Sequence, residues 1–394
     1  MPDEVSHASP STRLAVAPSP NNYKTMMSST SVTGSFDAYD PEKSLPHPLL
    51  RWSLWRIGLT LIYGTVWIPL ALVTFLVDQL FWWLTMPLCW IMPCTNGTKR
   101  LPPVKPSDEK YALVTGGGHG IGRAISEELA KRKFNLILAA RNQSKLTEAA
   151  EALAEKYSVK VLTLPADLGV AGGAEKLHRD VNDLLLTKGD DHHVAILVNN
   201  AGRLNRSAYL SEELSGIMSM TQLNSISYAI LMRLFGEDMA KRGCGRILNN
   251  ASVVGWLPGP SCAMYHATKA FVVSLSQSVG YELRPHGVGV TCLTPPGTKS
   301  SLFAGEAENA LIAHDMLTEK TEKVAAFGVR RLMKGARLAA PGGFSFFIDV
   351  VSRCMPEPIL LYFAHLAWWP LDNLLDPRDC NKTLEAQRPK HDAA

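Results

Sequence analysis

Three side chains in the second half of the chain have types and spacings suited to acid–base chemistry. Tyr265 and Lys269 stand four positions apart in a helix-like pattern, so a helix would place them one turn apart on one face. A phenol normally has a pKa near 10, and a neighbouring ammonium is expected to lower that pKa toward the useful range. Ser252 follows a strand-like run, and its hydroxyl can donate to and accept from a substrate oxygen. A Tyr/Lys pair alone is more often a surface feature, so its meaning depends on what surrounds it.

A second chemical feature is the glycine-rich stretch Thr115–Gly122. It lies between an apolar run, Tyr111–Val114, and a helical pattern, Arg123–Lys133. A strand–turn–helix of this kind brings helix N-terminal amides to a pyrophosphate, and glycine keeps side chains from holding the phosphates away. The spacing is Gly-x3-Gly-x-Gly, and by itself such a turn fits an ordinary loop equally well.

The elements that must position these residues alternate along the chain, which predicts a parallel sheet covered on both faces. In such a sheet the ligand crevice lies at the carboxyl ends of the strands, where Ser252 is expected. The expected strands are Ala112–Thr115, Leu136–Ala140, Val159–Leu164, Ala195–Asn199, Arg246–Ala251 and Val288–Leu293, and the expected helices include Ser144–Tyr157, Ala171–Leu186, Glu212–Lys241 and Tyr265–Arg284.

With these motifs in order, the chain resembles the short-chain dehydrogenase/reductase family over roughly Asp108–Lys334. The resemblance implies an α/β fold, a Rossmann-type doubly wound parallel sheet, and four catalytic residues. Tyr265 would give or take the proton at the substrate oxygen, and Ser252 would hold that oxygen. Lys269 would lower the Tyr265 pKa and grip the nicotinamide ribose, while Asn224 would support a water relay to Lys269. The matching motifs are Thr115–Gly122, Asn199–Gly202, Asn224, Ser252 and Tyr265-x3-Lys269.

The same resemblance implies a cofactor site. Asn199–Gly202 would steady the sheet beside the cofactor, and Asp167 would meet the adenine; a helix kink for Asn224 and a turn cap for Asp167 are the alternatives. A doubled proline, Pro295–Pro296, leaves the register of Thr298 at the nicotinamide open. The expected cofactor residues are Gly116, Gly118, His119, Gly120, Ile121, Gly122, Arg141, Asp167, Leu168, Asn200, Ala201, Gly202, Tyr265, Lys269, Pro296, Gly297 and Thr298.

The residues after the second expected strand favour NADP(H). An NAD site places a carboxylate there, but no Asp or Glu occurs from Asn135 through Lys145. Arg141 instead offers a guanidinium to a 2′-phosphate, with a solvated surface arginine as the alternative. Arg123 would assist if it pointed toward the ribose.

The N-terminal region predicts a disordered tail (1–48) and then a membrane anchor (49–94). Ile57–Val77 holds no charged residue in 21 positions, about 32 Å as a helix, which is enough to cross a bilayer. Leu80–Cys94 is shorter and contains Pro87, so it is a hairpin return arm or an interfacial segment. Basic residues on both sides favour a hairpin with cytosolic ends, with the endoplasmic reticulum as the default membrane; one crossing, a buried soluble helix and a lumenal domain stay open. A proline-rich linker (95–107) leads to the catalytic domain (108–340).

The C-terminal region predicts a mobile substrate lid and an apolar cover. Lys299–Glu322 is loosely patterned, as a lid would be. Arg337–Ala340 is expected as a last edge strand. The apolar helices that follow (341–375) would cover the substrate mouth, rest on a membrane or pack as core, before a disordered tail (376–394). The segment after Gly335 resembles the hydroxysteroid dehydrogenase and 3-ketoacyl-CoA reductase branch of the family.

Composition narrows the function further. The net charge of +4 is scattered, so no nucleic-acid surface is expected, and seven cysteines without a CxxC pair argue against disulfides or a zinc site. His192–His193 is expected as a solvated loop, so no metal is expected. The sequence therefore predicts a membrane-anchored NADP(H)-dependent oxidoreductase. It would interconvert a carbonyl and an alcohol on a lipophilic substrate such as a steroid, a retinoid, a 3-ketoacyl-CoA or a sphingoid ketone. Homodimerisation is a family expectation, and a non-catalytic scaffold that binds NADP(H) or a protein is the rival.

Overall fold

The computed structural model of the chain describes Val73 and residues 101–207, 209–298, 318–343, 345, 348, 352, 355 and 357–368. The chain divides into two units, Met1–Ile91 and Met92–Ala394, and every described residue except Val73 belongs to the second. The expected tail (1–48), the apolar runs Ile57–Val77 (Val73 apart) and Leu80–Cys94, and the C-terminal tail (376–394) lie outside the described residues. Among the residues that are described, none of the helices combines the length and apolar character needed to cross a membrane.

The centre of the described domain is a seven-stranded parallel sheet with strand order β3-β2-β1-β4-β5-β6-β9. The predicted doubly wound parallel sheet is confirmed, and each predicted strand, the edge strand Arg337–Ala340 included, is found within two residues of its expected ends. The strands are β1 (Lys110–Thr115), β2 (Asn135–Ala140), β3 (Val161–Pro165), β4 (His193–Asn199), β5 (Gly245–Asn250), β6 (Val288–Leu293) and β9 (Leu338–Ala339).

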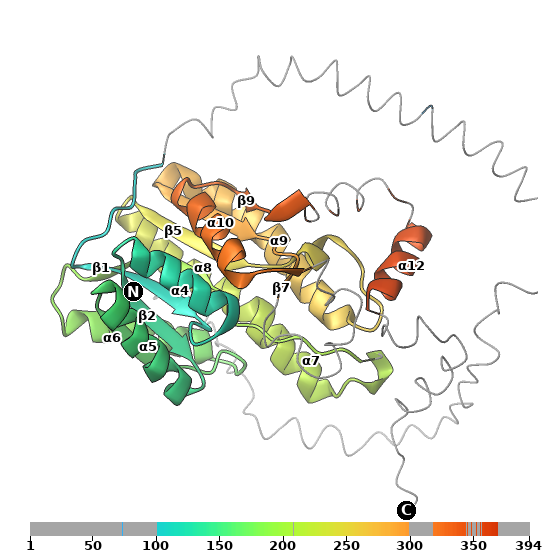
Figure 1. The fold of residues 1–394 in the computed structure, drawn as a ribbon, viewed down its shortest axis with the longest axis horizontal. Coiled ribbons are helices and arrows are strands. Elements are labelled where there is room, and N and C mark those ends of the chain that lie inside the picture. The colour runs from blue at the N-terminus through green and yellow to red at the C-terminus, as the bar shows by residue number, and fades with distance from the viewer. Residues whose placement is uncertain are drawn as a thin grey trace, which may run out of the picture. The chain divides into compact units, whose positions relative to one another are not determined.

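Helices cover both faces of this sheet (Figure 1). Successive residues of β1 show why: Ala112 and Val114 point into one apolar core, whereas Tyr111 and Leu113 point into the other. A strand buried on both faces is apolar throughout, which is the pattern in this sequence. One core is shared with α4 (Gly120–Lys131), α5 (Gln143–Tyr157) and α10 (Thr321–Met333), and the other with α6 (Gly173–Leu186), α8 (Ser227–Lys241) and α9 (Ala263–Leu283).

The helix predicted over Glu212–Lys241 contains a change of winding. It consists of α7 (Leu214–Thr221), a π-helical turn (Gln222–Ile226) and α8. Asn224 lies in the π turn and is fully buried. Single π turns inside helices are frequent at functional sites, so both the kink and a role in the site fit this residue.

The segment expected as a linker is packed where the structure describes it. Val104 is buried in the core shared by α4 and α10. The Arg246 guanidinium donates a hydrogen bond to the Pro102 carbonyl oxygen at 2.7 Å. The second half of the proline-rich segment is therefore held against the sheet rather than acting as a free spacer.

Two short strands and a last helix follow β6. Strand β7 (Gly297–Thr298) pairs with β8 (Thr318–Glu319), and α12 spans Glu357–Ala367. Residues 299–317 of the expected lid lie outside the described residues, while its last residues form β8 and the start of α10. Regular secondary structure therefore begins at Thr318, before the expected end of the lid at Glu322.

Candidate active site

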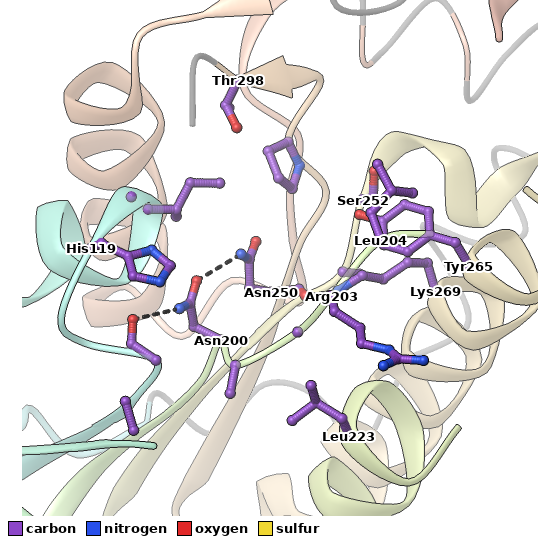
Figure 2. Close-up of a pocket in the computed structure, with 18 of the residues that line it drawn as sticks. His119, Asn200, Arg203, Leu204, Leu223, Asn250, Ser252, Tyr265, Lys269 and Thr298 are labelled. Atoms are coloured by element: carbon purple, nitrogen blue, oxygen red, sulfur yellow. Dashed lines mark hydrogen bonds between the residues drawn. The ribbon is translucent and has the colours of Figure 1, made fainter. Parts of the chain in front are cut away.

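A cavity of about 450 Å³ opens at the carboxyl ends of the central strands. Residues directly after β1, β4, β5 and β6 line it, represented by Gly116, Asn200, Ala251 and Pro295. Figure 2 shows His119 and Asn200 on one side of the cavity, with Ser252, Tyr265 and Lys269 on the other. The sheet edge thus joins the two motifs that the sequence separates by more than a hundred positions.

The glycine turn leaves its backbone facing the cavity. Gly116 and Gly120 have φ values of +67° and +57°, in the left-handed region that glycine favours. A Cβ on Gly116 would lie 2.9 Å from the Asn200 amide nitrogen, and one on Gly122 would lie 2.2 Å from the Gly116 carbonyl oxygen. The N-cap residue of α4, His119, makes no side-chain cap hydrogen bond, and a helix N-terminus beside a glycine turn is suited to bind an anion.

Asn200 fixes the turn to the sheet. Its side-chain nitrogen donates to the carbonyl oxygens of Thr115 at 3.1 Å and Gly116 at 3.3 Å, and its side-chain oxygen accepts from the Asn250 amide at 2.9 Å. The ends of β1, β4 and β5 are therefore tied together. This is the supporting position that the resemblance implied for Asn199–Gly202.

Tyr265 and Ser252 lie close together at the other side of the cavity (Figure 2). Burial raises the pKa of the Tyr265 phenol, and the neighbouring Ser252 hydroxyl acts in the opposite direction. Both residues line the cavity and are almost completely buried.

Lys269 lies beside this pair. Its Nζ is 5.7 Å from the centroid of the Tyr265 ring and donates to the Asn250 carbonyl oxygen at 2.9 Å. Burial lowers the pKa of Lys269 to about 8, so the amine is charged at neutral pH. The expected lowering of the Tyr265 pKa by Lys269 is not what this geometry gives. Desolvation of the buried phenol outweighs the opposing effect of Ser252, so the pKa of Tyr265 is raised.

Asn224 stands behind the cavity wall. Its Oδ1 accepts from the Arg203 backbone amide at 3.0 Å, and its Nδ2 donates to the Arg203 carbonyl oxygen at 2.8 Å. A Cβ on Gly202 would lie 3.2 Å from Asn224 Oδ1 and 3.7 Å from Lys269 Nζ, so Gly202 occupies the space between them. The side chain of Asn224 therefore fixes the backbone that follows strand β4. Its part in a water relay stays a prediction.

All the expected cofactor residues line the cavity except Gly122 and Asp167. Gly122 provides the close backbone approach described above, and Asp167 Oδ1 accepts from the Gly169 amide at 2.8 Å, as the turn-cap alternative has it. Arg123 does not assist at the ribose, because its guanidinium donates to the Ala149 carbonyl oxygen instead. Thr298 lies in the cavity wall despite the doubled proline (Figure 2).

The cavity also has lining residues that sequence reasoning missed. Asn142 and Lys145 lie near Arg141, where Asn142 caps α5 by accepting from the Lys145 amide at 3.0 Å. A capping residue before a helical pattern is a signal that could have found this pair. At the opposite end, apolar lining comes from Leu204, from Val253 and Val254 directly after Ser252, and from Trp368, which are three separate segments of the chain.

Comparison with known proteins identifies the family. The family model for short chain dehydrogenases matches residues 110–310, about half of the chain. The chain belongs to the short-chain dehydrogenase family. The match ends before α10 and α12, so the apolar end of the cavity includes a contribution from outside it.

Two relatives of this short-chain dehydrogenase are very-long-chain 3-oxoacyl-CoA reductases. The Mus musculus protein is 33% identical over 196 residues, covering 49% of this chain and 60% of the relative. Reductase B of Danio rerio is 32% identical over 238 residues, covering 55% of this chain and 72% of the relative. The chain therefore matches only about 60% of the length of the mouse relative.

The fold also matches solved structures. A short-chain dehydrogenase from Sphingobium yanoikuyae, solved in complex with NADPH, superposes with a TM-score of 0.54 at 24% identity. The match covers 72% of this chain and 98% of that protein. This likeness supports the doubly wound architecture of the present dehydrogenase.

Proposed function

We propose that this protein is an NADPH-dependent carbonyl reductase that acts on lipophilic ketones, with long-chain 3-oxoacyl thioesters as the leading substrate class. One observation carries the proposal: the buried residues Tyr265 and Ser252 line the same cavity as the glycine turn. A proton donor and a phosphate-binding turn in one cavity are what hydride transfer to a carbonyl requires.

The residues present fit a nicotinamide cofactor. The start of α4 and the Gly116–Gly122 turn would bind a pyrophosphate, because backbone amides at a helix N-terminus favour an anion and the glycines let the turn pack tightly against Asn200. When bound, the reduced nicotinamide supplies a hydride to the carbonyl carbon of the substrate. Lys269 would hold the nicotinamide ribose, and Thr298 would meet the carboxamide.

The proton comes from this chain. Because burial raises the pKa of Tyr265, the phenol stays protonated at neutral pH. It is therefore suited to donate its proton to the carbonyl oxygen of the substrate. The Ser252 hydroxyl would hold that oxygen by a second hydrogen bond. As Tyr265 loses its proton, the adjacent Lys269 ammonium stabilises the negative charge that develops on the phenol oxygen.

Preference for NADPH is supported by the residues after β2. Arg141 is exposed at the cavity rim, and Lys145 lines the same region. Two cations and no carboxylate between Asn135 and Lys145 suit a 2′-phosphate better than a free ribose hydroxyl.

The substrate class is supported by the apolar end of the cavity and by the names of the relatives. The uncharged run Ile57–Val77 supports anchoring in a membrane, where a long-chain substrate would be concentrated. The endoplasmic reticulum with a cytosolic catalytic domain, and a homodimeric state, belong to the same proposal.

The test is turnover by purified full-length protein. NADPH consumption and the hydroxy product are measured with 3-oxohexadecanoyl-CoA, with NADH as the comparison cofactor. We expect NADPH to be oxidised with product formation, and Tyr265→Phe to lower kcat by about 1000-fold. Tyr362→Phe, on the exposed face of α12, is the matched control.

A wild-type rate that Tyr265→Phe leaves unchanged contradicts the proposal. So does NADPH binding without turnover of any long-chain ketone, which would favour the non-catalytic scaffold.

A further inference from the structure

The residue that follows α12 contributes directly to the cavity wall. Trp368 directly follows this helix, is only 2% exposed, and lines the cavity. It packs in one apolar cluster with Tyr265, Val253, Val254 and Met220. Trp368 therefore belongs to the apolar end of the cavity and not to the end formed by the glycine turn.

A hydrogen bond fixes the orientation of the Trp368 indole. Its Nε1 donates to His266 Nε2 at 2.8 Å, although the two residues are 102 positions apart. An indole N–H is only a donor, so His266 Nε2 must accept and its proton must be on Nδ1. That nitrogen lies 2.9 Å from the Leu257 carbonyl oxygen, which accepts the proton's hydrogen bond.

His266 is a stable acceptor because its ring is buried and neutral. Burial lowers the pKa of His266 to about 4, so the ring keeps this tautomer at physiological pH. A Cβ on Gly259 would lie 2.2 Å from the ring, which shows how closely the preceding loop packs against it. The indole is therefore held by a rigid partner that directly follows Tyr265 on α9.

The two faces of α12 differ sharply. Leu360 and Ala364 are buried against the domain, whereas Tyr362 and Phe363 are 62% and 55% exposed. The helix thus buries one face, and the tryptophan that directly follows it lines the cavity. The opposite face provides positions where a substitution does not touch the cavity.

We infer that Trp368 is a specificity-determining residue, an indole wall oriented by His266 against which the alkyl chain of the substrate packs beside the reacting carbonyl. The inference rests on the proposed reductase function and adds the residue that selects its substrate. It assigns the residue that directly follows α12, outside the matched family segment, to substrate binding rather than to cofactor binding.

The experiment compares Trp368→Ala, Trp368→Phe and the control Phe363→Ala in the full chain. Three quantities are measured: kcat and KM for 3-oxohexadecanoyl-CoA, the NADPH Kd from fluorescence, and the Kd of 3-hydroxyhexadecanoyl-CoA on NADP⁺-loaded protein by calorimetry. We expect Trp368→Ala to raise KM and the acyl Kd at least about tenfold, because an apolar wall is lost. The NADPH Kd should stay within about twofold, since the cofactor half is untouched.

Trp368→Phe separates the wall from its anchor. It keeps an aromatic ring but loses the bond to His266, so the ring is no longer held in the binding orientation and acyl binding should weaken about threefold. If Trp368→Ala loses its cooperative thermal transition and is therefore unfolded, Trp368→Phe alone tests whether the indole determines acyl affinity.

Equal acyl affinity in Trp368→Phe and wild type, or in Trp368→Ala and Phe363→Ala, overturns the inference while the reductase proposal stands. Trp368-dependent acyl binding without NADPH oxidation overturns the reductase proposal and leaves the acyl wall in place. Wild-type protein that neither binds nor reduces these thioesters overturns both.

Discussion

The two ends of the cavity are built from different parts of the chain. At the cofactor end, backbone shapes the surface: Gly116 and Gly122 bring main chain close to main chain, and Asn200 bonds to carbonyl oxygens. At the substrate end, side chains shape it, and Val253 and Trp368 come from segments that meet only in the fold. The comparison predicts that one added methyl group is enough to weaken cofactor binding at the first end. At the second end, the size of a side chain determines how well the substrate binds.

The largest effect is expected from Gly122→Ala. The added Cβ would lie 2.2 Å from the Gly116 carbonyl oxygen and 2.4 Å from the Asn200 amide, so the turn must move. We expect the NADPH Kd to rise by about 10- to 100-fold, as overpacking of a rigid site costs. Fluorescence titration measures it, and Gly343→Ala is the control, because nothing lies within 4 Å of its new Cβ. Unchanged NADPH affinity in Gly122→Ala would show that backbone closeness is not what shapes the cofactor end.

The catalytic residues between the two ends should show a pH dependence of their own. Burial lowers the pKa of Lys269 to about 8, so the stabilising ammonium is present below that pH and is lost above it. We expect kcat/KM for ketone reduction to fall about tenfold between pH 7 and pH 9. Tyr265 does not produce this fall, because its pKa is raised and the phenol keeps its proton across the range.

Lys269→Arg is the matching variant, since a guanidinium stays charged throughout this range. Its absolute rate is expected to be lower, but its profile should be flat to pH 9. The same fall in both proteins would assign the titration to another group.

A smaller effect is expected at the rim of the cofactor end. Arg141→Glu should raise the KM for NADPH about tenfold and lower that for NADH, because a carboxylate repels the 2′-phosphate and accepts from a ribose hydroxyl. Lys131→Glu, in the last turn of α4, reverses a charge away from the cavity and serves as the control. Equal shifts in the two variants would mean that Arg141 acts only through net charge.

The same contrast explains what could be predicted from the sequence. The strands and the glycine turn are local patterns, because strands buried on both faces are continuous apolar runs and left-handed backbone favours glycine at particular positions. Ser252, Tyr265 and Lys269 could be placed together since parallel strands end at one edge of the sheet.

Other features depend on packing that no local pattern carries. The bond from Trp368 to His266 joins residues 102 positions apart, and Arg123 turns to the Ala149 carbonyl rather than to the ribose. Burial also reverses the expected direction for Tyr265, because its desolvation follows from the folded surroundings and not from the spacing to Lys269.

The central claim is that hydride and proton arrive at one carbonyl from the two sides of this cavity. The direct measurement uses NADPH that carries deuterium at both C4 positions, with mass spectrometry of the product formed from 3-oxohexadecanoyl-CoA. The account predicts one deuterium at C3 of the 3-hydroxy thioester with wild-type protein, and almost no product with Tyr265→Phe. Product without deuterium, or labelled product formed equally well by Tyr265→Phe, would contradict it.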